Sequence, residues 1–130
     1  MLIVTGKIRG KVRPRVCRGH AFTPKDTVEY ENLVRDCYKK QYGRYLECFI
    51  KAFIIAYYKV PKSLIVKKCV QAIKDGLEEP TKKPDVDNIA KIILDSLNCI
   101  AYKDDSQLIE FMVVKSYTED EERVEFELNQ

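Results

Sequence analysis

The feature that most constrains the fold is a run of residues, 46–58, that reads Leu-Glu-Cys-Phe-Ile-Lys-Ala-Phe-Ile-Ile-Ala-Tyr-Tyr. Aromatic and β-branched side chains dominate this run, and they pack well on the pleated, half-buried surface of a strand. Pro61 follows closely and lacks the N–H that a central strand needs. The sequence therefore predicts one long central strand, on which the other elements must be assembled.

Three further segments alternate apolar and polar residues as strands do, namely 2–9, 107–117 and 123–128. We expect the last two to be antiparallel strands joined by an acidic turn. Residues 10–25 hold two glycines, two prolines and five basic residues, which predicts a loop or an irregular hairpin.

Helical spacing of apolar residues recurs in three segments, 27–42, 64–74 and 87–98. Gly43 suits the end of the first helix, because glycine readily adopts the conformation that terminates a helix. We therefore predict an α+β fold, with one compact domain over residues 1–130. A mixed or antiparallel sheet of about four strands would be packed by about three helices.

Composition bounds the class of protein. The chain has 130 residues, of which 45% are hydrophobic, so one packed core can form without disulfides or metals. Its first residues form an apolar run too short for a signal peptide or a membrane span. We expect a soluble, cytoplasmic protein with no membrane partner.

Cysteine and histidine usage narrows the chemistry. The five cysteines are odd in number and include no Cys-x-x-Cys pair, which argues against a disulfide framework and a zinc ribbon. We expect reduced thiols. His20 is the single histidine, so a histidine-based metal site or a Ser-His-Asp triad has little to build on. Any catalysis must depend on carboxylates and lysines.

Charge is distributed unevenly, although the net charge is only +3. Seven basic residues and no acidic ones fall between positions 7 and 25: Lys7, Arg9, Lys11, Arg13, Arg15, Arg18 and Lys25. Such clustering favours a polyanion, because each lysine or arginine on a phosphate releases counterions. A solvated loop and strand face would carry the same charges, so charge alone does not identify nucleic acid as the partner.

Two aspartates mark the start of the third predicted helix. Pro84 disfavours helical backbone at Lys83, so the helix must begin after it, with Asp85 and Asp87 at its mouth. Two carboxylates so close together can converge on one cation. Asp is also a preferred helix cap, however, so this pair alone is equally typical of an ordinary helix start.

More charged residues follow the pair. Lys91 lies one helical turn after Asp87, and Asp95 continues the same face. A short connector then brings Asp104 and Asp105 back beside the helix. If they have no catalytic role, Asp87 and Lys91 form an ordinary i,i+4 ion pair on the helix surface, and Asp104-Asp105-Ser106 is a common turn sequence.

Carboxylates from two segments would make a hard oxygen site of the kind that Mg²⁺ prefers, with Mn²⁺ as a substitute. Bound Mg²⁺ lowers the pKa of a water and neutralises charge on a phosphate under in-line attack. A nearby lysine stabilises the extra negative charge of the transition state. Neither role needs histidine.

Motifs that carry a family resemblance run along nearly the whole chain. They are Gly10-Lys11-Val12-Arg13-Pro14-Arg15, Phe22-Thr23-Pro24-Lys25, Lys83-Pro84-Asp85-Val86-Asp87-Asn88-Ile89 with Lys91, Asp95 with Leu97-Asn98, Asp104-Asp105-Ser106-Gln107, and Lys115. With these motifs the chain resembles the RusA-type Holliday-junction resolvases of bacteria and their phages. One departure is the connector 99–103, which lacks the glycine expected there.

The resemblance implies an activity and a site. The family's Mg²⁺ ligands match Asp85, Asp87 and Asp105, its catalytic lysine matches Lys91, and Asp95 and Asp104 stand at further acidic positions. A homodimer with two active sites would nick opposite strands of a four-way junction in recombination and repair. The DNA phosphates would be held by six basic residues: Arg13, Arg15, Arg18, Lys25, Lys82 and Lys83.

Two alternatives stay open. A degenerate relative would hold branched DNA without cutting it, and would bind without metal. A metal-dependent phosphohydrolase would act on a small substrate instead of DNA. The basic N-terminal segment favours DNA over a small substrate, and turnover of free nucleotides would identify such a phosphohydrolase.

Overall fold

The protein is described by a computed structural model, which places residues 1–12, 15–17, 19–22, 24–62, 67–76 and 79–130. In chain order the elements are β1 (Leu2–Thr5), β2 (Arg15–Cys17), β3 (His20–Phe22), α1 (Lys25–Gln41), β4 (Ile50–Lys59), α2 (Lys67–Lys74), α3 (Val86–Ser96), the short 3₁₀ helix η2 (Asp105–Gln107), β5 (Leu108–Thr118) and β6 (Arg123–Asn129). The predicted α+β class is confirmed.

A four-stranded mixed sheet forms the centre of the molecule, in the order β1-β6-β4-β5. The predicted central strand is β4, which pairs in parallel with β5 and antiparallel with β6. It begins at Ile50 rather than at residue 46. The backbone before Ile50 forms hydrogen bonds outside the sheet. The Leu46 N–H donates to the Ala101 carbonyl at 2.6 Å, and the Gln107 side chain donates to the Leu46 and Cys48 carbonyls.

The predicted pair of strands at the C-terminal end is only partly right. Both strands form and run in opposite directions, but β4 lies between them in the sheet. Residues 119–122 therefore cross the end of β4 instead of making a hairpin turn. Alternation of side chains fixes a strand's buried face, but it does not identify the strand's partner.

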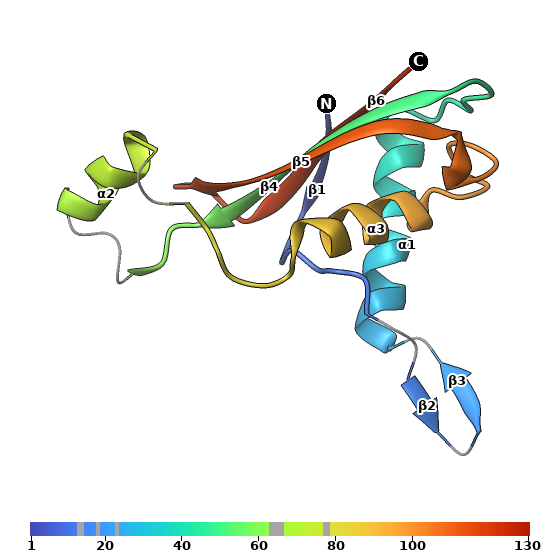
Figure 1. Ribbon diagram of the computed structural model, residues 1–130, viewed down its shortest axis with the longest axis horizontal. Coiled ribbons are helices and arrows are strands. Elements are labelled where there is room, and N and C mark those ends of the chain that lie inside the picture. The colour runs from blue at the N-terminus through green and yellow to red at the C-terminus, as the bar shows by residue number, and fades with distance from the viewer. Residues whose placement is uncertain (13–14, 18, 23, 63–66, 77–78) are drawn as a thin grey trace.

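The first strand is shorter than predicted, because it ends at Thr5 rather than at residue 9. Gly6 takes a φ of 118° there, and its N–H donates to the Glu122 carbonyl at 3.1 Å, so the chain leaves the sheet. The predicted hairpin over 10–25 is present as the two-stranded sheet β2–β3, which projects beyond the start of α1 (Figure 1).

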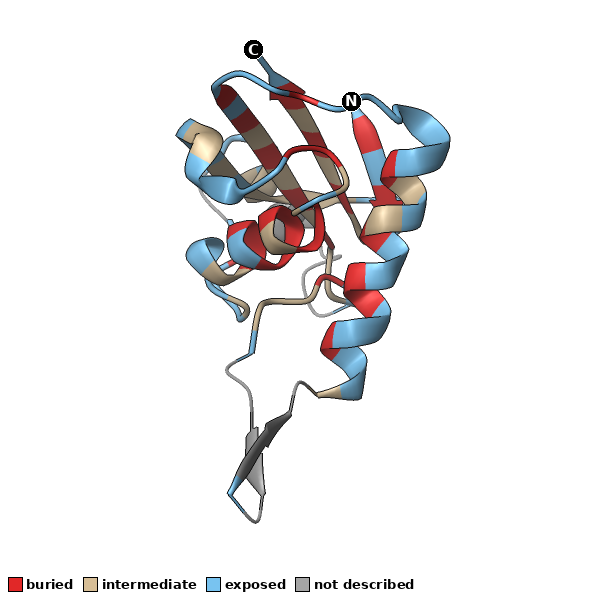
Figure 2. Cartoon of the chain, turned by 90° about the vertical axis from the view of Figure 1, so that its right-hand side faces the viewer, coloured by how far each residue is buried: buried red, intermediate tan, exposed pale blue. Residues whose placement is uncertain are grey.

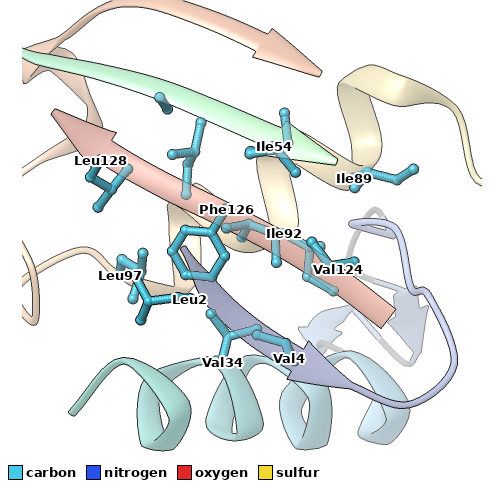
Figure 3. Close-up of a cluster of buried hydrophobic side chains, with 14 of the residues drawn as sticks. Leu2, Val4, Val34, Ile54, Ile89, Ile92, Leu97, Val124, Phe126 and Leu128 are labelled. Atoms are coloured by element: carbon cyan, nitrogen blue, oxygen red, sulfur yellow. The ribbon is translucent and has the colours of Figure 1, made fainter. Parts of the chain in front are cut away.

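The core lies between the sheet and the helices α1 and α3, as the buried helix faces in Figure 2 indicate. Residues of β4 alternate, so that Ile50, Ala52, Ile54, Ala56 and Tyr58 are buried. Figure 3 shows side chains from β1, β6 and both helices meeting this face. No helix in the described ranges is long and apolar enough to cross a membrane.

Candidate active site

The start of α3 follows the sequence prediction closely. Pro84 precedes it, after a cis peptide bond, and Val86 is the first helical residue. Asp85 stands just before the helix with an extended backbone (φ −68°, ψ 154°), and its side chain makes no capping hydrogen bond. The carboxylates of Asp85 and Asp87 are both exposed. The simple helix-cap explanation therefore fails for Asp85, and its carboxylate is available for a ligand.

The N-terminal segment packs directly against this helix start. A Cβ added to Gly10 would lie 2.5 Å from the Cβ of Pro84 and 3.1 Å from that of Asn88, so only glycine allows this approach. The Lys11 N–H also donates to the Asn88 carbonyl at 2.9 Å. The first basic residues of the chain are thereby held beside Asp85.

An open cleft of about 410 Å³ lies where these two segments meet. Its lining residues are Lys7, Ile8, Arg9, Gly10, Lys11, Val12, Pro24, Asp26, Thr27, Lys83, Pro84, Asp85 and Asn88. Four of them are basic and two are acidic, with Arg9 paired to Asp26 at 3.6 Å. The cleft thus presents net positive charge around the carboxylate of Asp85, which suits a phosphate held by a cation.

A second acidic group lies at the other end of α3. Burial, together with the neighbouring Asp104 and Asp95, raises the pKa of the Asp105 carboxyl. Hydrogen bonds from Ser106 and Asp105 lower the pKa of Asp104, which also caps η2. Because like charges crowd here, a proton or a cation would relieve the repulsion.

Basic side chains bracket the second group. The Lys91 ammonium lies 3.6 Å from the Asp95 carboxylate, so its ion pair is with Asp95. The Lys11 ammonium lies 2.7 Å from Glu31 and 3.8 Å from Asp95. Lys11 therefore connects the N-terminal segment with α1 and with the end of α3.

The two acidic groups are separate in this chain. Asp87 and Asp95 are eight residues apart on one helix, which is about 12 Å along its axis. Among the residues that the structure describes, no group of three or more Asp, Glu, His or Cys side chains is placed to hold a metal ion. The ligand set Asp85, Asp87 and Asp105 stays a prediction.

The connector between α3 and Asp104 makes its turn without the expected glycine. Cys99 adopts a φ of 66°. In the described ranges, every other residue with a positive φ is a glycine. The Cys99 N–H donates to the Tyr102 carbonyl at 2.7 Å, and the Tyr102 hydroxyl donates to the Leu94 carbonyl inside the core. Asp104 and Asp105 are therefore delivered beside α3 despite the strained backbone at Cys99.

Comparison with known proteins decides the family. The model of the endodeoxyribonuclease RusA family matches residues 5–129, which is nearly the whole chain. The chain belongs to the RusA endodeoxyribonuclease family. A curated relative, the uncharacterized protein YqaN of Bacillus subtilis (strain 168), is 49% identical over 70 residues. That alignment covers 53% of this chain and 49% of YqaN, so the chain spans about half the length of this relative.

The remaining basic residues predicted for this RusA-family chain fall into three groups. Lys82 and Lys83 are exposed beside Asp85. Lys25 is exposed at the start of α1 and pairs with Glu29 at 3.8 Å. The third group is Arg13, Arg15 and Arg18, whose side chains lie outside the described residues. The side chains of His20 and Phe22 lie outside them as well. Among the described cysteines, Cys37, Cys48 and Cys99 form no disulfide in this structure.

Sequence reasoning did not place several residues that the RusA fold brings to this region. Lys7, Arg9 and Lys11 belong to the basic run but carried no signal that set them apart from it. Lys115 donates to the Lys82 carbonyl at 2.6 Å, and both ammonium groups lie over the Tyr58 ring, at 5.8 and 5.0 Å from its centroid. This contact ties β5 to the segment that precedes Asp85. Only the tertiary structure reveals it.

Proposed function

We propose that the protein is a Mg²⁺-dependent endodeoxyribonuclease that resolves four-way DNA junctions by paired nicks. The observation that carries this proposal is the pair of exposed aspartates, Asp85 and Asp87, beside a basic cleft. The side chain of Asp85 makes no capping hydrogen bond to the helix. Family membership supports the reaction class. The cleft supports the substrate class, because its positive lining suits a phosphodiester backbone.

The donor set of the helix start fits Mg²⁺. This ion is commonly held by one or two carboxylates, with waters and phosphate oxygens completing its shell. Asp85 and Asp87 would supply those carboxylates. Asp105, the third ligand that the family resemblance implies, lies with Asp95 and Asp104 at the other end of α3, so it would have to approach the pair when the ion binds. When bound, Mg²⁺ activates a water for attack and neutralises charge on the phosphodiester.

The chain's own residues would complete the site. Lys83 and the basic wall of the cleft would hold the phosphates on either side of the scissile bond. Lys91 would stabilise the negative charge that develops in the transition state. Asp95 holds the Lys91 ammonium at 3.6 Å, which restricts where that charge can act. We further propose that the protein works as a homodimer, because two symmetric sites can address symmetric strands of a junction.

Substitution of the aspartate pair tests the proposal. Asp85→Asn and Asp87→Asn should each reduce cleavage of a synthetic four-way junction by at least about 100-fold, since a lost metal contact removes several kcal/mol. Junction binding should survive, because both side chains are exposed and lie outside the core. Glu29→Gln, an exposed carboxylate on α1, is the control. Full cleavage by either aspartate variant would refute the metal site.

The alternative of a non-catalytic DNA-binding module is favoured by one observation, the separation of the two acidic groups among the described residues. It predicts junction binding that is independent of Mg²⁺, with no nicks at any Mg²⁺ concentration. Mg²⁺ titrations of the Asp105→Asn and Asp85→Asn variants separate the two functions. If Asp85 and Asp105 share one metal site, both variants should need more Mg²⁺ than wild type for half-maximal cleavage. If the protein is a binding module, junction binding should be independent of Mg²⁺ in both variants and no cleavage should occur.

A further inference from the structure

Lys115 occupies a position of β5 at which the strand pattern predicts an apolar residue. It pairs in register with Ala56, which is buried on the face of β4 that the helices cover. Val113 and Tyr117, its neighbours on the same face of β5, are half-buried against the core. A charged group at the margin of a core is costly unless it has hydrogen-bond partners. The contacts of the Lys115 ammonium should therefore show why a lysine stands there.

The Lys115 ammonium contacts the segment that leads from α2 to α3 (Figure 1). It donates to the Lys82 carbonyl at 2.6 Å, and it lies 5.8 Å from the centroid of the Tyr58 ring. The Lys82 ammonium lies over the same ring at 5.0 Å, so Lys82 contacts this corner of the sheet through both its backbone and its side chain. In the described part of the chain, no carboxylate forms an ion pair with Lys115. Its ammonium instead contacts a backbone carbonyl and an aromatic ring.

The segment before Asp85 has few other contacts of this kind. Pro80 is buried and Pro84 is half-buried, but the three residues between them are exposed. Among the residues that the structure describes, the bond from Lys115 is the only hydrogen bond that joins residues 81–84 to another element. Asp85 follows Lys82 after three residues, so the position of its carboxylate depends on how this stretch is held.

We infer that Lys115 is a positioning residue for the metal site: its ammonium anchors the Lys82 carbonyl and thereby holds the Asp85 carboxylate in place for Mg²⁺. This inference rests on the proposed function, because it assigns a role toward the same metal ligand. Residues that orient a metal ligand without touching the metal commonly change metal affinity or activity by roughly 10–100-fold when they are replaced. Lys115 would act in this way through the backbone.

Three roles for this lysine make different predictions. If Lys115 acts only through its charge, it repels a cation at Asp85, and its removal should strengthen cation binding. If it contacts a DNA phosphate, its removal should weaken junction binding and leave cation binding to the free protein unchanged. If it anchors the Lys82 carbonyl, its removal should weaken cation binding, because the Asp85 carboxylate is then no longer held in one place. The direction of the change in cation affinity therefore separates the three roles.

Mn²⁺ binding to the DNA-free protein tests the positioning role, measured by the loss of the free-ion EPR signal. Lys115→Met removes the donor but keeps a long side chain, and it should weaken Mn²⁺ binding by about tenfold. Lys115→Arg keeps a cationic donor and should restore binding to within about twofold of wild type. The matched control is Lys82→Met, which removes the other ammonium over Tyr58 but leaves the carbonyl that accepts the hydrogen bond. This control should not weaken Mn²⁺ binding.

Hydrogen exchange gives a second readout that needs no metal. Amides of residues 81–88 should exchange faster in Lys115→Met than in wild type, while those of β4 should keep their wild-type rates. Lys115→Gln, whose side chain is shorter, takes the place of Lys115→Met in both measurements if the latter does not fold.

The outcomes separate this role from the proposed function. If the wild-type protein binds no Mn²⁺, the proposed metal site fails and the positioning role fails with it. If the wild type binds Mn²⁺ and Lys115→Met binds it equally well or more tightly, only the positioning role is overturned. Weaker binding in Lys115→Met, with rescue by Lys115→Arg and faster exchange at residues 81–88, supports it. Equal weakening by Lys82→Met would also overturn the role, because that variant keeps the anchored carbonyl.

Discussion

At the scale of single residues, the candidate site rests on carboxylates that the fold leaves without a structural task. Asp85 stands at a helix start, where aspartate usually caps, but it makes no capping bond. Asp87 is exposed one turn before Lys91, yet the ion pair of Lys91 is with Asp95. Both ordinary explanations for these aspartates fail in this structure. Two carboxylates beside a basic cleft are what a metal-assisted phosphodiesterase requires.

Lys11 is predicted to be a structural residue as well as part of the cleft. Its ammonium pairs with Glu31, whose side chain is only 12% exposed, and with Asp95. Lys11→Met should lower the free energy of unfolding by about 2 kcal/mol, because it leaves a largely buried carboxylate without its closest partner. Chemical denaturation measures the change. Lys25→Met is the control, since its pair with Glu29 is 88% and 63% exposed and should contribute under about 0.5 kcal/mol. Equal effects in the two variants would contradict this role.

At the scale of elements, the sequence predicted what depends on local patterns. Pro84 and the apolar spacing after it located the start of α3, and the aromatic run identified β4 as the central strand. The partners of β5 and β6 were not accessible, because alternation gives a strand's face but not its neighbour. The contact between Asp105 and Asp95 depends on the path of the connector, which turns at Cys99 with a positive φ. Because a positive φ is usually signalled by glycine and none stands there, the sequence did not predict this turn.

Packing of the N-terminal segment on α3 is predicted to set the shape of the cleft. Gly10→Ala should lower the free energy of unfolding by about 1–3 kcal/mol, because its Cβ would meet the rigid ring of Pro84 at 2.5 Å. Junction cleavage should fall as well, since the displaced segment lines the cleft with Asp85. Thermal unfolding and cleavage rates are the measurements. Lys7→Ala, in the same segment but exposed, should leave stability unchanged; wild-type stability in Gly10→Ala would refute the close contact.

At the scale of the whole molecule, buried tyrosines predict how stability depends on pH. Burial raises the pKa of Tyr38 and of Tyr58 to about 12, from the ordinary value of 10.0. The unfolded chain therefore releases these protons at lower pH than the folded protein does, so unfolding is favoured progressively as the pH rises from 10 to 12. Stability should be constant with respect to these groups below pH 9 and fall above it.

Tyr58→Phe separates this effect from general alkaline damage. The Tyr58 hydroxyl is buried without a hydrogen-bond partner among the described residues, so its removal should be neutral or stabilising at pH 7. The variant should also lose less stability than wild type between pH 10 and pH 12. Urea denaturation at pH 7, 10 and 11 measures both. A variant that is less stable at pH 7 would indicate that the hydroxyl does have a partner.

The whole molecule combines a small two-layer fold with a basic cleft and an acidic helix start, within a family of endodeoxyribonucleases. The most direct test is cleavage of an end-labelled four-way junction and of a linear duplex of the same sequence, each with Mg²⁺ and with a chelator. We predict symmetric nicks near the crossover of the junction, only with Mg²⁺, and little or no cleavage of the duplex. Binding to the junction without nicks at any Mg²⁺ concentration, or equal cleavage of the duplex, would contradict the proposed function.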